Sequence, residues 1–225
     1  SSGNTDADRM ITLYVPEGKT SKYTDITAWK TKYPGRIFEG EMSEPYLADD
    51  GMSYICAGVS QTATLYKGKN EDNIVVPSTI DKDGKKYYVT GIDKLAFYEG
   101  TTGNLNITNI TIEDGVTSIG AETFNNCKNL VTIKLPSTLT SIKNNAFENC
   151  GSLVRVESMA PAFDIPANLF SGANNSEKTL YCSDSTLYRA KEGWNSGFTY
   201  FMQGTIKENV IVQSEEGVNM KFICS

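Results

Sequence analysis

Apolar residues recur every 23 positions between residues 110 and 153 of this 225-residue chain. Each of two copies reads apolar, polar, apolar, then a turn, the triplet Thr-Ser-Ile, a polar stretch around one Phe, and finally Cys and Leu. The matched positions are Ile110 and Ile133, Ile112 and Leu135, Val116 and Leu139, Ile119 and Ile142, Phe124 and Phe147, Cys127 and Cys150, and Leu130 and Leu153. One coil of this length cannot enclose a core, so these positions must be buried against the same positions one coil away. The pattern predicts a solenoid.

The pattern continues on both sides with irregularities. Residues 74–77 open an earlier coil that carries an insertion at 81–88, and residues 154–156 open a later coil with an irregular middle. We expect one Phe from each coil to stack in an internal column made of Phe97, Phe124, Phe147 and Phe170.

Two hairpins are expected near the start of the solenoid. Residues 41–68 alternate apolar and polar positions in two runs, which predicts a β-hairpin that covers the first coil. Within the insertion, Asp83-Gly84 predicts a type I′ turn, because both central residues of that turn have positive φ. A calcium loop is the alternative, but the remaining acidic ligands of such a loop are missing.

A longer period of about 163 to 168 residues relates the two ends of the chain. Residues 11–38 share a strand, a Tyr, a Trp and a Phe with residues 178–201, and residues 217–224 resemble residues 50–56. The matches are Leu13 with Leu180, Tyr23 with Tyr188, Trp29 with Trp194, Phe38 with Phe201, Met220 with Met52 and Cys224 with Cys56.

These matches predict that the chain is part of a tandem array of similar units. Residues 1–40 would be a tether and the terminal strand and helix of a preceding unit, and residues 207–225 the start of a following one. Residues 41–206 would form one complete repeat unit, with a capping hairpin (41–73), repeats (74–177) and a terminal coil (178–206). Residues 11–40 should then fold like residues 178–206, with the Trp facing the core. The alternative is a single unit whose ends carry similar elements.

Residues 135–150, Leu-Pro-Ser-Thr-Leu-Thr-Ser-Ile-Lys-Asn-Asn-Ala-Phe-Glu-Asn-Cys, resemble the BspA-like leucine-rich repeats of bacterial cell-surface proteins. The inserted hairpin, the Thr before Phe124 and the missing Cys after Phe97 and Phe170 depart from that pattern. The resemblance implies an α/β solenoid, a right-handed coil of short parallel strands with a β-hairpin cap and a strand-helix end. It also implies a bacterial protein that is secreted or held at the cell surface, with a lipid anchor as one means of attachment. Its role would be adhesion or protein binding and not catalysis.

Charge and composition exclude several other classes. The net charge is −6 and no basic stripe is present, which argues against nucleic acid as a partner. No apolar run approaches the 18 or so residues of a membrane span.

Candidate chemistry is sparse. The chain contains no His, which removes His-dependent nucleophiles and His-ligated metals. Its five cysteines are odd in number and lack a C-x-x-C spacing, so we expect buried thiols, with a disulfide between Cys127 and Cys150 as the alternative. We expect no catalytic residue, cofactor or metal.

The best interaction candidates are strand residues whose side chains alternate away from the core. Asn73, Val75 and Thr179 belong to the same two rows, whose central members are the predicted protein-binding strip. That strip consists of Asn109, Thr111, Thr132, Lys134, Arg155, Glu157 and Tyr181. Its mixed chemistry suits a host or bacterial surface protein.

The alternative function is a surface scaffold or a glycan-binding accessory that uses exposed aromatics. The candidates for such an aromatic platform are Tyr23, Trp29, Tyr188 and Trp194, but their matched positions favour packing in the core. The pattern identifies neither a ligand nor an oligomeric state.

Overall fold

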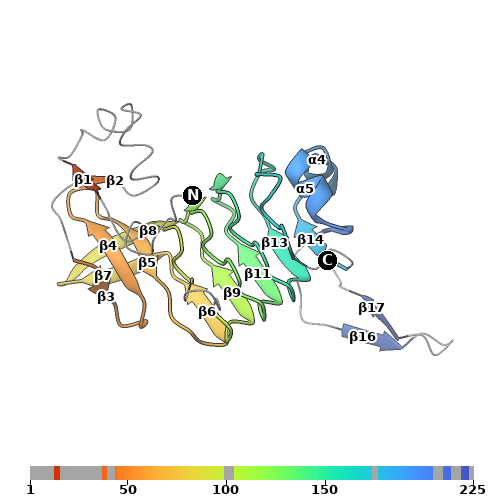
Figure 1. Ribbon diagram of the computed structural model, residues 1–225, viewed down its shortest axis with the longest axis horizontal. Helices are drawn as coiled ribbons and strands as arrows, with labels where there is room; N and C mark the ends of the chain where they lie inside the picture. Colours follow the sequence, from red (N-terminus) through yellow and green to blue (C-terminus); the bar gives the residue numbers. More distant parts are fainter. Residues whose placement is uncertain are drawn as a thin grey trace, which may run out of the picture.

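The computed structural model describes residues 44–98, 104–173 and 177–204 in full, and the backbone of four short strands nearer the ends of the chain. The fully described part is a parallel β-solenoid. It runs from a group of strands at one end to two short helices at the other (Figure 1).

Six short parallel strands form one sheet along the solenoid. In spatial order they are β6 (Asn73–Val76), β9 (Asn109–Ile112), β11 (Thr132–Leu135), β13 (Arg155–Ser158), β14 (Thr179–Cys182) and β15 (Tyr200–Gln203). Paired residues in β9, β11 and β13 are 23 positions apart, so Ile110, Ile133 and Val156 lie side by side in the core. The spacing is 36 between β6 and β9, 24 between β13 and β14, and 21 between β14 and β15. A 23-residue period therefore describes only the middle coils.

The Thr-Ser-Ile triplets contribute to a second sheet. Its parallel strands are β5 (Thr62–Lys67), β8 (Lys85–Ile92), β10 (Ser118–Ile119) and β12 (Ser141–Ile142). Ile119 and Ile142 are buried between the two sheets. The hydroxyl of Thr140 donates to the carbonyl of Thr117, and that of Thr117 to the carbonyl of Thr90, each at 3.0 Å. Side chains therefore link successive coils in addition to the backbone ladder.

Antiparallel strands cover the first coil. They are β3 (Tyr46–Leu47), β4 (Ser53–Ala57) and β7 (Thr79–Lys82). β4 and β5 form the hairpin predicted within residues 41–68, and β5 continues into the second sheet. β7 and β8 form the inserted hairpin, where Asp83 has a φ of 54° and Gly84 a φ of 73°. The predicted turn is confirmed.

The phenylalanine column is confirmed. Adjacent ring centroids lie 5.0 Å apart from Phe97 to Phe124, 5.2 Å from Phe124 to Phe147 and 5.4 Å from Phe147 to Phe170, all in stacked orientation. All four rings are buried. The backbone supports the same column, because the amide of Phe124 donates to the carbonyl of Ala146 at 2.9 Å in the next coil.

The α/β class overstates the helical content. In the described residues, the segments that carry the column are turns, and the two helices both follow β14. Glu122, Asn126, Asn145 and Asn149 have φ between 55° and 62°, the left-handed region that interrupts a right-handed helix. Two such residues flank Phe124 and two flank Phe147, so in these two coils the short path back to the next strand cannot be helical.

Two helices close the other end of the column. They are α4 (Ser185–Arg189) and α5 (Glu192–Gly197). Asp184 caps α4 by accepting hydrogen bonds from the amides of Thr186 and Leu187, at 2.9 and 3.2 Å. Trp194 is buried, and its ring centroid lies 6.4 Å from that of Phe170, the last ring of the column.

Two further strand pairs bear on the tandem array. β1 (Leu13–Val15) pairs in parallel with β2 (Ile37–Glu39), as β14 pairs with β15, and β16 (Val210–Gln213) pairs antiparallel with β17 (Asn219–Phe222). Tyr23, Trp29 and Cys224 lie outside the described residues. The array, with its unit boundaries, stays a prediction.

Replacing Phe147 by Ala should lower the free energy of unfolding by about 3–5 kcal/mol, because a cavity would open in the middle of the column. Urea denaturation monitored by far-UV circular dichroism measures this. Tyr88→Ala is the matched control at an exposed aromatic. Equal urea midpoints for the two variants would contradict the prediction that the column stabilises the fold.

Replacing Gly120 by Ala should destabilise the protein by about 1–3 kcal/mol. A Cβ there would lie 2.4 Å from the amide nitrogen of Lys94, a backbone atom of the preceding coil. Gly151→Ala is the control, because a Cβ at Gly151 meets nothing within 4 Å. The melting temperatures of the two variants should differ, and a loss of equal size at both positions would refute the steric explanation.

Candidate interaction face

The outer side of the six-stranded sheet carries two rows of side chains. Strand register places Asn73, Asn109, Thr132, Arg155, Thr179 and Tyr200 in one row, and Val75, Thr111, Lys134, Glu157, Tyr181 and Met202 in the other. We call this surface the outer face. The register therefore places every residue of the predicted strip side by side as expected.

The two rows are linked by contacts between neighbouring strands. Asn109 Nδ2 donates to Asn73 Oδ1 at 3.0 Å. Lys134 Nζ lies 3.1 Å from Glu157 Oε1. The β6 end of the face is thus an amide pair, and an ion pair occupies its middle.

Two members of the predicted strip are not exposed. Glu157 is 1% exposed and Tyr181 6%, whereas Lys134 is 52% exposed. Glu157 lies in register between Lys134 and Tyr181, and Tyr181 lies between Glu157 and Met202. The expectation that the whole strip is exposed was wrong for these two residues. Asn109 and Lys134 are exposed, and Thr111, Thr132 and Arg155 are half-buried.

The sequence analysis missed two exposed residues of the same face. Tyr200 and Met202 on β15 are 54% and 43% exposed, and they extend the rows beyond Thr179 and Tyr181. The sequence could have predicted them. If Phe201 points into the core, its neighbours Tyr200 and Met202 must point outward, because side chains alternate along a strand. The short 21-residue spacing concealed this.

The second sheet has a different surface. A groove of about 550 Å³ runs along it. Its lining is Thr64, Thr90, Gly91, Ile92, Asp93, Lys94, Thr117, Ser118, Ile119, Gly120, Ala121, Lys143 and Asn144. No aromatic ring lines this groove, so it lacks the stacking platform that a sugar-binding site commonly uses.

The aromatic residues near α4 and α5 are structural. Trp194 Nε1 donates to the carbonyl of Phe163 at 2.8 Å, and Tyr188 Oη donates to the carbonyl of Ala160 at 2.9 Å. Both side chains are buried. The prediction that they pack in the core is confirmed, and neither can serve as a carbohydrate platform.

The described cysteines are Cys56, Cys127, Cys150 and Cys182, and all four are buried thiols, as predicted. Cys150 Sγ donates to the carbonyl of Phe124 at 3.1 Å, and burial raises the pKa of this thiol well above its usual value. A protonated, inaccessible thiol is a packing residue and a poor nucleophile.

In the described ranges, no three His, Cys, Asp or Glu side chains are grouped so that they could hold a metal ion. Within the same part of the chain, no helix is both long and apolar enough to cross a membrane.

Lys178 is unusual because its amino group is buried among aromatic rings. It is fully buried, and its Nζ lies 4.8 Å from the ring centroid of Phe170 and 5.8 Å from that of Phe198. Burial lowers the pKa of Lys178 from 10.5 to about 8. The two ring faces partly offset the loss of hydration for the charged form.

Known proteins with this architecture are leucine-rich repeat proteins. The family model described as BspA type leucine rich repeat region matches residues 89–190 in six copies. This region is therefore similar to the BspA-type leucine-rich repeat family, in agreement with the resemblance noted in the sequence. None of the curated proteins compared with this chain matches it.

Two solved structures are similar. A leucine-rich repeat protein from Bacteroides capillosus is 28% identical with a TM-score of 0.50, over 63% of this chain and 100% of that one. A leucine rich cell surface protein from Faecalibacterium prausnitzii is 20% identical with a TM-score of 0.50, over 73% of this chain and 44% of that one. The second comparison supports the fold alone, and this chain spans less than half of that protein.

Replacing Lys178 by Met should stabilise the protein at pH 7 by up to about 3 kcal/mol, the value of a pKa lowered from 10.5 to about 8. Between these two pH values the native state binds fewer protons than the unfolded chain, so wild-type stability gains a contribution as the pH rises. The difference between variant and wild type should therefore shrink from pH 8 to pH 10.5. Urea titrations at pH 7, 8, 9 and 10 measure it, and a constant difference would contradict this account.

Proposed function

We propose that this chain is a non-enzymatic protein-interaction module of a bacterial cell-surface protein. Binding would use the outer face of the six-stranded sheet. The observation that carries this proposal is the continuous register of six parallel strands, each of which contributes one side chain to each row. Strands about 4.8 Å apart present these groups as one strip that needs no loop to become ordered.

The chemistry of the strip favours a protein partner. It offers amides at Asn73 and Asn109, hydroxyls at Thr111 and Thr132, and a guanidinium at Arg155. Such a mixture of donors and acceptors on a flat surface suits another protein surface better than it suits a small ligand, which is usually held in a concave pocket. Adhesion to host or bacterial surface proteins is the role that the family resemblance suggests.

Surface location is part of the same proposal. The similar protein from Faecalibacterium prausnitzii is described as a cell surface protein. The alternative is a scaffold that carries a glycan-binding site. That alternative is less well supported, because the groove on the second sheet has no aromatic lining and the candidate aromatics Tyr188 and Trp194 are buried.

The test is capture by the whole chain of immobilised extracellular-matrix proteins and bacterial surface proteins, in parallel with a glycan array. Thr132→Arg places a large side chain at the centre of the outer face. Ser141→Arg is the matched control on the second sheet, where another half-buried strand hydroxyl makes no side-chain hydrogen bond.

We expect Thr132→Arg to weaken protein capture at least tenfold, with Ser141→Arg close to wild type and both variants folded by circular dichroism. Capture that is unaffected by Thr132→Arg would move the site away from the outer face. Binding confined to the glycan array would favour the alternative function.

A further inference from the structure

The half of the outer face nearer β15 carries one arginine, Arg155 on β13. Arg155 is half-buried near the middle of the rows and makes no ion pair or hydrogen bond to any residue that the structure describes. The nearest acid along the sheet, Glu157, is instead bound by Lys134 at 3.1 Å. A guanidinium in this position retains its full capacity for a bidentate pair with a carboxylate.

Exposed side chains with apolar surface lie on β15, two strands beyond this arginine. Tyr200 is in the same row as Arg155, with Thr179 between them. Met202 is in the second row, next to Tyr181. The inward residue of β15, Phe201, packs against Phe198 with ring centroids 6.2 Å apart. The fold therefore uses Phe201 and leaves Tyr200 and Met202 to solvent.

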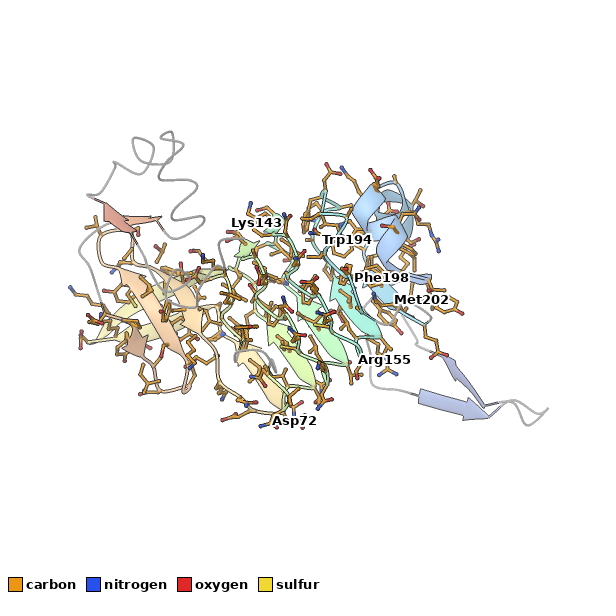
Figure 2. The ribbon with its side chains drawn as sticks, in the orientation of Figure 1. Asp72, Lys143, Arg155, Trp194, Phe198 and Met202 are labelled. Atoms are coloured by element: carbon orange, nitrogen blue, oxygen red, sulfur yellow. The ribbon has the colours of Figure 1, made fainter. Side chains whose placement is uncertain are left out.

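Charge is distributed unevenly along the face. Asp72 precedes β6 at one end, and Figure 2 shows it at the opposite side of the sheet from Arg155 and Met202. A second arginine, Arg189 of α4, lies 4.2 Å from the ring centroid of Phe201 at the β15 end. Asp184, which caps α4, lies near the same Cys182 side chain as Arg189, so the cation that this half of the sheet itself presents is Arg155.

We propose that Arg155, Tyr200 and Met202 form the part of the outer face that contributes most to binding, and that they bind a protein segment with a carboxylate side chain next to an apolar one. We call these three residues the end patch. The proposal rests on the proposed function and specifies its partner. Arg, Tyr and Met are enriched at the centres of protein interfaces, where a few residues supply most of the binding energy.

Other anionic partners fit the end patch less well. Nucleic acid and other polyanions require a series of cations to replace their counterions, and the Lys134 charge is already paired with Glu157. The Arg155 guanidinium makes no ion pair with a described residue, and the apolar surface of Tyr200 and Met202 lies two strands away, so the patch matches one carboxylate with an apolar flank.

The experiment is selection from a phage-displayed library of random 12-residue peptides on the whole chain. We expect the selected peptides to be enriched in Asp and Glu next to an apolar residue. A synthetic copy of a selected peptide should lose at least tenfold in affinity with Arg155→Gln and with Tyr200→Ser, and less with Arg155→Lys. Raising NaCl from 0.1 to 0.5 M should also weaken its binding several-fold, because salt screens the ion pair.

Matched controls test whether the loss of any exposed cation or any exposed tyrosine has the same effect as a change in the end patch. Lys143→Gln removes an exposed cation from the second sheet, and Tyr88→Ser removes a tyrosine that is 55% exposed on β8. Both controls should bind the peptide like wild type.

The outcomes distinguish the two proposals. Peptides that lose affinity with Thr132→Arg but not with Arg155→Gln and Tyr200→Ser would overturn the end patch and leave the outer face as the binding surface. Selected peptides without acid enrichment, or a library that yields no binder, would also overturn it, whatever the capture of whole proteins shows. Peptides indifferent to Thr132→Arg as well as to the end-patch variants would overturn both proposals.

Discussion

No coil of this protein can bury its own apolar residues, and the neighbouring coil supplies the missing half of the core. The column from Phe97 to Phe170 expresses this constraint most directly, with rings 5.0 to 5.4 Å apart. That spacing is close to the separation of neighbouring strands. The column, the two sheets and the rows of the outer face therefore share one repeat distance, and a change in one must be accommodated by the others.

A stack of this kind needs a different solution at each end. The hairpin of β4 and β5 covers the first coil with Tyr54 and Leu65, both fully buried. At the other end, Trp194 and Phe198 pack over Phe170, the last ring of the column. These end elements do not follow the repeat, because a cap must be apolar on only one side.

The sequence predicted the elements that repetition determines. The column and the strand register followed from residues that recur at fixed spacing, and the Asp83-Gly84 turn followed from local backbone chemistry. Burial of Glu157 and Tyr181 was missed because alternation along one strand indicates which side of the sheet a residue faces and not what covers that side. Tyr200 and Met202 were missed because the last coil is shorter than the period. The binding role of these residues stays a prediction.

The direction of the strands also governs how the protein would respond to force. The strands lie across the long axis of the solenoid, as Figure 1 shows, so tension between its two ends acts on one pair of neighbouring strands at a time. Coils would then separate one after another. At roughly 3.4 Å per extended residue, each 23-residue coil would release about 80 Å of chain. Such a stack would lengthen in steps under tension. Each step would lower the force on a partner bound at the outer face.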